Sequence, residues 1–235
     1  RDFQKPDSDA KAPVAVEIEV LPESVLTHIT RGNQLGGLKR YDEAVEAFYA
    51  AIKTAGRPVY TAYLNMGYVL FNKGDYVRAV EAYRQALSIK PNSWQCHYNL
   101  GEALYANQDY AGAEKEYRRV LELRAGGLAS RARHFLGLAV YKQKRIDEAI
   151  TEYRGAIEQA GGTYSEARYN LGIALLERGQ APEAEREFRL AIEQEKKSWP
   201  EAHYNLAQSL ENQRRYREAA DEYDIYLKLM PAGTD

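Results

Sequence analysis

Apolar and small residues recur along this chain at a helical spacing, and the whole pattern repeats after about 34 residues. Five versions of one phrase carry the repeat: Asn65-Met66-Gly67, Asn99-Leu100-Gly101, Phe135-Leu136-Gly137, Asn170-Leu171-Gly172 and Asn205-Leu206-Ala207. Gly32 marks a sixth, less complete copy upstream of these. A period of this length is typical of a helical solenoid, in which each repeat is a pair of helices.

The residues after each marker glycine or alanine follow the same pattern. An alanine comes twelve positions later, and an aromatic residue sixteen positions later, at Phe48, Tyr83, Tyr117, Tyr153, Phe188 and Tyr223. Antiparallel helices approach closely where a small residue on one faces a large residue on the other. We therefore expect Gly67 and Ala79 to make room for the rings of Tyr76 and Tyr83.

Turn and capping residues predict where the helices begin and end. The first helix of a pair should end near Gly74, Gln108 or Gly179, and the second should begin at a cap such as Asp75 or Asp109. Lys90-Pro91-Asn92 is typical of a helix end, and Ser198-Trp199-Pro200-Glu201 of a capping box.

In these small and large positions the chain resembles the tetratricopeptide repeat (TPR) family, in six consecutive copies over residues 25–231. The resemblance implies an all-α fold, a right-handed superhelical α-solenoid of antiparallel helix pairs. The six repeats would span 25–59, 60–93, 94–129, 130–164, 165–199 and 200–231, with 232–235 as a tail.

Residues 1–24 differ from the repeats. Residues 1–13 are polar, whereas 14–20 are rich in β-branched residues, as a strand would be. This segment is either a linker or the last strand of an upstream domain, or it lies along the solenoid or pairs with another chain. At the other end Tyr226 stands where five repeats have a small residue, so we expect a seventh repeat to clash there and the terminal helix to offer a surface for self-association.

Composition narrows the class of protein. The chain has 235 residues, 45% of them hydrophobic and 28% charged, with a mean hydropathy of −0.60. No stretch approaches 18 consecutive apolar residues, which argues against a membrane span. The net charge of −2 leaves no basic excess for a general nucleic-acid role. A soluble protein of the cytoplasm or the periplasm is compatible with these values.

No catalytic motif emerges from the sequence. Gly32 to Lys39 superficially suggests a phosphate loop, but Arg40 follows where Ser or Thr is required, and the segment lies within a repeat helix. The carboxylates fall mostly on second helices among Lys and Arg, as on solvated helix faces. We therefore expect no enzymatic activity, no cofactor and no metal site.

The cysteine and most of the histidines also favour structural roles over metal binding. Cys96 is the one cysteine, so no disulfide within the chain is possible, and we expect a buried thiol. His28, His97 and His203 share one repeat position in repeats that are not adjacent, which favours packing over metal ligation. His134 lies one position further on and should face the groove, in a contact or pH-sensitive role.

The concave surface of a solenoid, lined by its first helices, is the candidate binding site. Helical spacing brings a set of aromatic residues to a common side: Tyr68, Phe71, Tyr98, Tyr105, Tyr141, Tyr169 and Tyr204. Tyrosine offers large contact area at low entropic cost, which suits peptide recognition. Alternatively, some of these rings fill the gaps between adjacent repeats.

Asparagines recur two positions before the marker, at Asn65, Asn99, Asn170 and Asn205. The family resemblance implies that this position reaches the backbone of a bound peptide. Asn33 matches one residue of the carboxylate clamp of chaperone-binding members, but Ile29, Gln95 and Asn99 stand where those members have basic residues. An acidic chaperone tail is thus disfavoured, and an apolar or tyrosine-compatible peptide is favoured.

Three functions follow from the sequence. The first is a non-catalytic scaffold that holds an extended or helical segment of a partner, for example as an assembly factor. The others are the substrate-recruiting or regulatory arm of a larger enzyme and a self-assembling structural protein. The six-repeat length also looks like bacterial pilus-assembly lipoproteins of this family. Replacing Tyr98, Tyr105 and Tyr141 by Ala should abolish binding and leave helicity intact.

Overall fold

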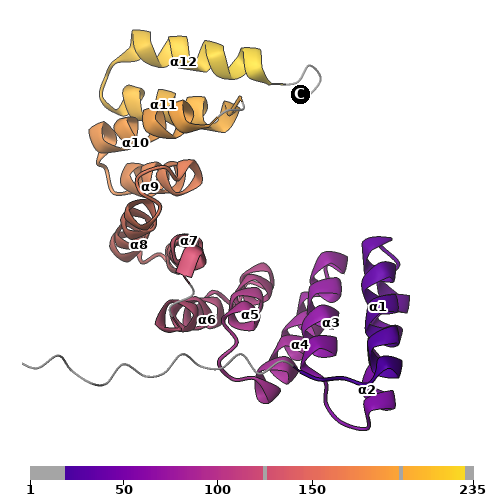
Figure 1. Ribbon diagram of the computed structural model, residues 1–235. Helices are drawn as coiled ribbons and strands as arrows, with labels where there is room; N and C mark the ends of the chain where they lie inside the picture. The colour runs from indigo at the N-terminus through magenta and orange to yellow at the C-terminus, as the bar shows by residue number, and fades with distance from the viewer. Residues whose placement is uncertain (1–18, 124–125, 196–197, 231–235) are drawn as a thin grey trace, which may run out of the picture.

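The computed structural model describes residues 19–123, 126–195 and 198–230 and contains twelve α-helices in this part of the chain (Figure 1). The helices are α1 (Glu23–Gly37), α2 (Tyr41–Ala55), α3 (Tyr60–Lys73), α4 (Tyr76–Ile89), α5 (Trp94–Ala106), α6 (Tyr110–Glu122), α7 (Ala129–Lys142), α8 (Ile146–Gln159), α9 (Ser165–Glu177), α10 (Ala181–Gln194), α11 (Pro200–Asn212) and α12 (Tyr216–Leu229). A short 3-10 helix, η1 (Gly126–Leu128), precedes α7. The predicted all-α solenoid is confirmed.

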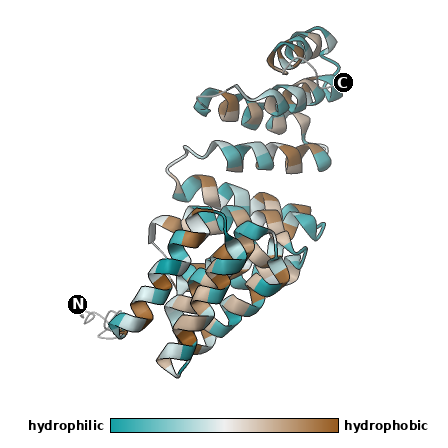
Figure 2. Ribbon diagram, turned by 90° about the vertical axis from the view of Figure 1, so that its right-hand side faces the viewer, coloured by the Kyte–Doolittle hydropathy of each residue, from teal (hydrophilic) through white to brown (hydrophobic). Residues whose placement is uncertain are grey.

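The helix pairs follow one another along an arc. The odd-numbered helices lie on its inner side and the even-numbered helices on its outer side (Figure 1). Each helix carries both hydrophobic and hydrophilic positions (Figure 2), because one side packs against neighbouring helices and the other meets water. The predicted strand over 14–20 lies outside the described residues except for Glu19 and Val20, which have no regular secondary structure.

Each of the first five repeats contains one tight contact between a glycine and a ring. A Cβ atom added to Gly32, Gly67, Gly101, Gly137 or Gly172 would lie 2.5 to 2.8 Å from the nearest ring carbon of the second helix. The rings are fully buried; they are Phe48, Tyr83, Tyr117, Tyr153 and Phe188. The predicted place for Tyr83 is therefore confirmed. Tyr76 packs elsewhere, with its ring centroid 5.4 Å from that of Phe71.

Most predicted helix ends are confirmed. Gly74 and Gly179 have φ angles of 86° and 80°, and Gln108 takes the same left-handed conformation after α5. Asp109 caps α6 by accepting a hydrogen bond from the Gly112 N–H at 2.9 Å. The expected capping box at Ser198 is wrong, because Trp199 is the N-cap of α11 and makes no side-chain cap. Ser198 therefore lies one residue too early to form it.

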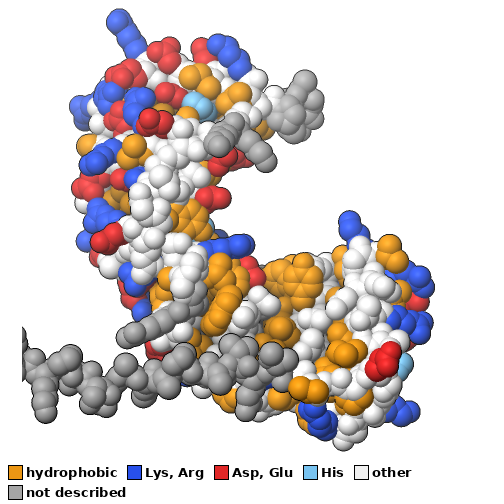
Figure 3. Space-filling model, viewed as in Figure 1, with side chains coloured by type: hydrophobic (Ala, Val, Ile, Leu, Met, Phe, Trp, Pro, Cys, Tyr) orange, Lys and Arg blue, Asp and Glu red, His pale blue; other side chains and the backbone are white. Residues whose placement is uncertain are grey.

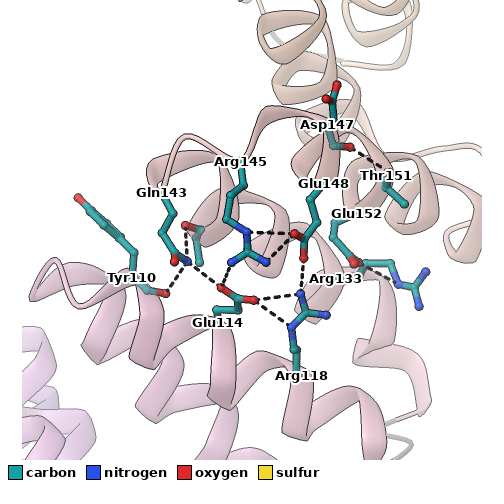
Figure 4. A network of polar contacts seen from close by, with 11 residues as sticks. Tyr110, Glu114, Arg118, Arg133, Gln143, Arg145, Asp147, Glu148, Thr151 and Glu152 are labelled. Atoms are coloured by element: carbon teal, nitrogen blue, oxygen red, sulfur yellow. Dashed lines mark hydrogen bonds and ion pairs between the residues drawn. The ribbon is translucent and has the colours of Figure 1, made fainter.

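The convex side carries a network of ion pairs that joins successive repeats (Figure 4). Glu114 on α6 accepts hydrogen bonds from Gln143 at 2.8 Å and from Arg145 at 2.6 Å, both in the turn between α7 and α8. Arg118 links Glu114 to Glu148. Burial alone would raise the pKa of Glu114, but these hydrogen bonds outweigh it and lower the pKa.

The same network recurs two repeats later. Glu185 on α10 accepts hydrogen bonds from Gln213 at 2.9 Å and from Arg215, while Arg189 pairs with Glu185 at 3.0 Å. Each network ties a second helix to the turn of the following repeat. The angle between successive repeats, and with it the spacing of the first helices on the concave side, is thereby constrained.

One carboxylate joins the chain before α1 to helix α3. Glu19 accepts hydrogen bonds from the N–H of Tyr60 at 3.1 Å and from the N–H and hydroxyl of Thr61 at 3.0 and 2.9 Å. Helix α3 has Val59 at its N-cap and no side-chain cap of its own. Glu19 therefore supplies the missing acceptor for free amides at the positive end of the helix dipole.

We expect Glu19→Ala to lower the free energy of unfolding by about 1 to 2 kcal/mol, as the loss of an N-cap does. Glu46→Ala is the matched control, because Glu46 is exposed on α2 and makes no polar contact with a described residue. Urea unfolding followed by circular dichroism measures both variants. Equal stability of the two would show that the Glu19 carboxylate contributes nothing to α3.

Candidate functional site

The first helices form the wall of a hollow on the inner side of the arc (Figure 3). Hydrophobic side chains gather along its inner edge over α5 and α7, and charged side chains are more numerous on the outer side (Figure 3). This face is formed by rigid, mutually packed helices, and a scaffold of that kind presents side chains in fixed positions.

The predicted aromatic residues divide into three groups in the structure. Tyr68 is 59% exposed and Tyr204 is 40% exposed. Phe71, Tyr105, Tyr141 and Tyr169 are half-buried and pack against the core. Tyr98 is buried, with only 7% of its surface exposed. The exposed and half-buried rings offer contact area to a ligand, whereas Tyr98 offers little.

Tyr98 belongs to the core between the third and fourth repeats. Its ring centroid lies 5.9 Å from those of Tyr117 and Phe135, both in edge-on contact. The alternative that some rings fill gaps between repeats therefore applies to Tyr98. The expected result for replacing Tyr98, Tyr105 and Tyr141 together needs correction, because removing the Tyr98 ring would leave a cavity and destabilise the fold.

The asparagines on the concave face join one repeat to the next. Asn65 donates to the Asn33 side-chain oxygen at 2.9 Å, and Asn205 donates to the Tyr169 hydroxyl at 2.8 Å. Asn170 donates to His134 at 2.8 Å. One N–H of each of these three amides is thus used within the chain, and the second N–H and the side-chain oxygen of Asn65, Asn170 and Asn205 remain.

Asn99 differs from the other three. It makes no side-chain hydrogen bond to any residue that the structure describes, so both ends of its amide are open. In the preceding repeat the half-buried hydrocarbon side chain of Leu64 occupies the position that Tyr169 and His134 take elsewhere. Among these four asparagines, Asn99 has the most hydrogen-bonding capacity left for a ligand.

His134 is buried, contrary to the expectation that it faces the groove. It is 6% exposed and contacts the Tyr164 hydroxyl at 3.0 Å and Asn170 at 2.8 Å. Because Asn170 donates to Nε2, the proton of the neutral ring sits on Nδ1 and is donated to Tyr164. Burial lowers the pKa of His134 to about 4. The side chain is therefore a structural link between α7 and α9.

The predicted packing role of His97 and His203 is confirmed, and it belongs to a regular pattern that the sequence reading missed. Each histidine pairs with a glutamate on the second helix of its own repeat. In the fourth and fifth repeats an arginine at the same repeat position makes the corresponding pair. The four pairs are His97–Glu116 at 2.5 Å, Arg133–Glu152 at 3.7 Å, Arg168–Glu187 at 2.6 Å and His203–Glu222 at 2.7 Å. A glutamate fifteen positions after the marker in repeats three to six was the visible signal; the first two repeats have Ala47 and Ala82 there.

Glu102 and Arg131 are further groove residues that the sequence reading missed. Burial raises the pKa of the half-buried Glu102 carboxyl, an effect that the nearby Arg131 partly offsets. Arg131 lies over the rings of Tyr98 and Phe135, with its guanidinium carbon 5.7 and 5.9 Å from their centroids. These rings hold an exposed cation in the centre of the concave face.

Three further properties of the described residues concern metal ligands, the cysteine thiol and membrane spans. No group of three or more His, Cys, Asp or Glu in this part of the chain is arranged to hold a metal ion. Cys96 is fully buried, its thiol contacts the Tyr83 carbonyl oxygen at 3.4 Å, and burial raises its pKa to about 12. Within the described helices, none is long and apolar enough to cross a membrane.

Comparisons with known proteins agree with this architecture. Three family models match the chain: one described as a TPR repeat over residues 67–108, and two described as tetratricopeptide repeats over 98–165 and 140–208. Together the three matches cover more than half of the chain. No curated protein sequence matches it.

Several solved structures share the fold at low sequence identity. PilW, described as a widely conserved type IV pilus biogenesis factor, is 17% identical with a TM-score of 0.76, over 91% of this chain and 96% of that protein. PilF of Pseudomonas aeruginosa is 16% identical with a TM-score of 0.73, over 90% and 94% of the two chains. YrrB, described as having an unusual peptide-binding site, is 22% identical with a TM-score of 0.64, over 80% and 95%.

Proposed function

The chain belongs to the tetratricopeptide repeat family, and from this premise we propose that it is a non-catalytic scaffold that holds an extended or helical segment of a partner protein in its concave groove. The observation that carries the proposal is the set of open groups on the first helices. Tyr68 is largely exposed, the side chain of Asn99 has no hydrogen-bond partner among the described residues, and Arg131 forms no ion pair with them.

The chemistry of the groove suggests what the partner segment looks like. The residues that face the groove on α1, α3 and the first two turns of α5 are uncharged. They include Asn33, Asn65, Tyr68 and Asn99. Charged groups follow from Glu102 onward. Uncharged amides and phenol rings bind peptide backbone and apolar side chains and give little attraction for a run of acidic residues. An acidic chaperone tail is therefore not the expected partner.

Relatives of this fold give the proposal a context. YrrB is described as a peptide-binding protein and PilW as a pilus biogenesis factor. We infer that this chain likewise binds a protein segment, as an assembly factor would. Groove side chains decide which segment is bound, because the fold alone does not specify a partner.

We expect the double variant Tyr68→Ala/Asn99→Ala to retain at most about a tenth of the partner captured by the wild-type chain, a loss of roughly 1.4 kcal/mol. The matched control is Tyr49→Ala/Gln85→Ala, which removes an exposed phenol and an exposed amide from the second helices α2 and α4. The measurement is a quantitative pull-down from the native source at equal helicity.

Retention of the same partners by the groove variant and the wild type would contradict a groove-binding function. Loss of a partner with the control variant instead would place binding on the convex side. In either case the proposal fails, since both variants keep the helix pairs intact.

A further inference from the structure

A hollow of about 600 Å³ opens between α1 and α3, at the end of the groove next to α2. Gly36 and Gly37, the last two residues of α1, form one wall, and Tyr68 and Val69 of α3 form the opposite wall. Tyr41, the first residue of α2, closes the side. Gly37 leaves the hollow open, because a Cβ atom there would meet no atom within 4 Å. At Gly36 the helices are close together instead, since a Cβ atom would lie 2.8 Å from the Val69 side chain.

The other repeats show what this position normally contains. The residue four positions after the marker is Phe71, Tyr105, Tyr141, Leu176 or Glu211 in repeats two to six, and Gly36 in the first. In repeats two and three that ring packs on the first residue of the following helix. The centroid distances are 5.4 Å for Phe71–Tyr76 and 5.3 Å for Tyr105–Tyr110.

Tyr41 is the first-repeat counterpart of Tyr76 and Tyr110, yet no ring of a described residue packs against it. The chain thus keeps one half of an aromatic pair and omits the other. Tyr68, 59% exposed, adds a second aromatic surface to the same hollow. An aromatic pair of this kind is more favourable than the area that it buries would suggest.

The hollow contains one charged group. Lys39 is exposed at its rim, just after α1, and forms no ion pair with any residue of the described part of the chain. The remaining polar lining consists of the uncharged amides of Asn33, Asn65 and Asn72 and the hydroxyls of the two tyrosines. The charge of the hollow is therefore positive, and it complements a carboxylate.

We propose that this hollow is an anchor site for an aromatic side chain of the partner segment, with a neighbouring carboxylate of that segment paired to Lys39. The inference rests on the proposed function and names the partner chemistry that the groove reads. The aromatic ring packs against Tyr41, as Phe71 and Tyr105 pack against Tyr76 and Tyr110 in the next two repeats. A single cation holds a single carboxylate, which distinguishes this site from a clamp for an acidic tail.

Gly37→Phe tests the site, because a Cβ atom on Gly37 meets no atom within 4 Å and the new ring fills the hollow from within the chain. The substitution removes a helix glycine, so the variant is expected to be at least as stable as the wild type. Gly127→Phe makes the same exchange in η1, where the Cβ atom also meets no atom within 4 Å, and serves as the control.

The first probe is p-cresol, a small-molecule analogue of the tyrosine side chain. Its binding is monitored through the backbone amide signals in NMR spectra. In the wild-type chain and in Gly127→Phe, its addition is expected to shift the amide signals of Gly36, Gly37 and Tyr68. In Gly37→Phe these shifts are expected to disappear. Shifts that persist in Gly37→Phe, or that are no larger at the hollow than around Tyr49, would overturn the proposal.

The second probe is a displayed library of random peptides selected on the wild-type chain. Enriched peptides should carry Phe, Tyr or Trp beside Asp, Glu or the chain end, and should bind Gly37→Phe at least about tenfold more weakly. Lys39→Glu exchanges one long polar side chain for another, so the backbone conformation should stay the same. Because the positive charge is replaced by a negative one, we expect binding to weaken about threefold or more. Enrichment without an aromatic residue, or equal binding to Gly37→Phe, would overturn the anchor site.

Asn99→Ala separates the two proposals, because Asn99 does not line the hollow. Peptides that bind Gly37→Phe as well as the wild type but lose affinity for Asn99→Ala would leave the groove function standing and refute the anchor. Peptides that ignore both substitutions would refute both.

Discussion

Gly101→Leu is expected to unfold the third repeat and to lower the free energy of unfolding by about 3 kcal/mol or more. A Cβ atom at position 101 would already lie 2.8 Å from the Tyr117 ring, closer than atoms in contact can approach. The ring has no room to retreat, because Tyr117 is fully buried and packs on Tyr98 and Phe135. A leucine would add further atoms in the same place, so either the ring leaves the core or helices α5 and α6 move apart.

The control for this prediction is Gly127→Leu, since the Cβ atom at position 127 meets no atom within 4 Å. Urea unfolding monitored by circular dichroism gives the stability of both variants and of the wild type. A change of less than about 0.5 kcal/mol for Gly101→Leu would mean that α5 does not pack closely against the Tyr117 ring of α6.

The second large effect is a loss of stability in mild acid that depends on His134. Its pKa is lowered from 6.5 to about 4 in the folded protein because the ring is buried. The unfolded chain therefore binds a proton at a higher pH than the folded chain does. The stabilising contribution is complete above pH 6.5 and is lost as the pH falls toward 4. Over that range the loss amounts to about 3 kcal/mol.

His134→Gln removes the titrating group and keeps a polar side chain between Tyr164 and Asn170. The difference in unfolding free energy between wild type and variant should therefore shrink as the pH falls from 6.5 to 4. His97 does not mask the effect. Burial alone would lower the pKa of His97, but the hydrogen bond that the ring donates to the Glu116 carboxylate helps to raise the pKa overall. Its contribution is thus fully present below pH 6.5 and is lost as the pH rises through the raised pKa. A pH-independent difference would show that the pKa of His134 is the same in the folded and unfolded chains, which contradicts a buried neutral ring.

The sequence predicted the features that repeat within each helix pair. The marker glycines and the rings sixteen positions later recur in register, and they face each other as Gly67 and Tyr83 do. Helix caps such as Asp109 could be predicted because its side-chain oxygen lies just before the first backbone amides of a helix, which have no partner within the helix. These features depend on local spacing along one or two neighbouring helices, which a single sequence contains.

Contacts between repeats were harder to predict. Tyr98 and Tyr204 share one repeat position, yet Tyr98 is enclosed by Phe135 of the next repeat, while Tyr204 is exposed beside Tyr223 and Tyr226. His134 is buried for the same reason, because Tyr164 covers it from the loop before α9. Whether a side chain at such a position is buried or exposed depends on the size of residues about 30 positions away in the sequence. Helical periodicity does not supply that information.

Two signals were present in the sequence and can be used in other repeat arrays. One is the pairing of a cation four positions before the marker with a glutamate fifteen positions after it, as in Arg168–Glu187. The other is the pair of glycines, Gly36 and Gly37, where the other repeats have larger residues; Gly37 leaves a hollow open beside Tyr41. The first indicates a structural ion pair, and the second indicates a hollow beside a ring that packs on no other described ring.

Site-specific photo-crosslinking tests the groove function most directly. A photoreactive benzoyl-phenylalanine replaces either Tyr68 on α3 or Tyr49 on α2, which are 59% and 52% exposed and lie on first and second helices respectively. We predict that the bound partner crosslinks to the chain through position 68 and not through position 49. A partner that crosslinks through position 49 and not through position 68 would contradict a groove-binding scaffold.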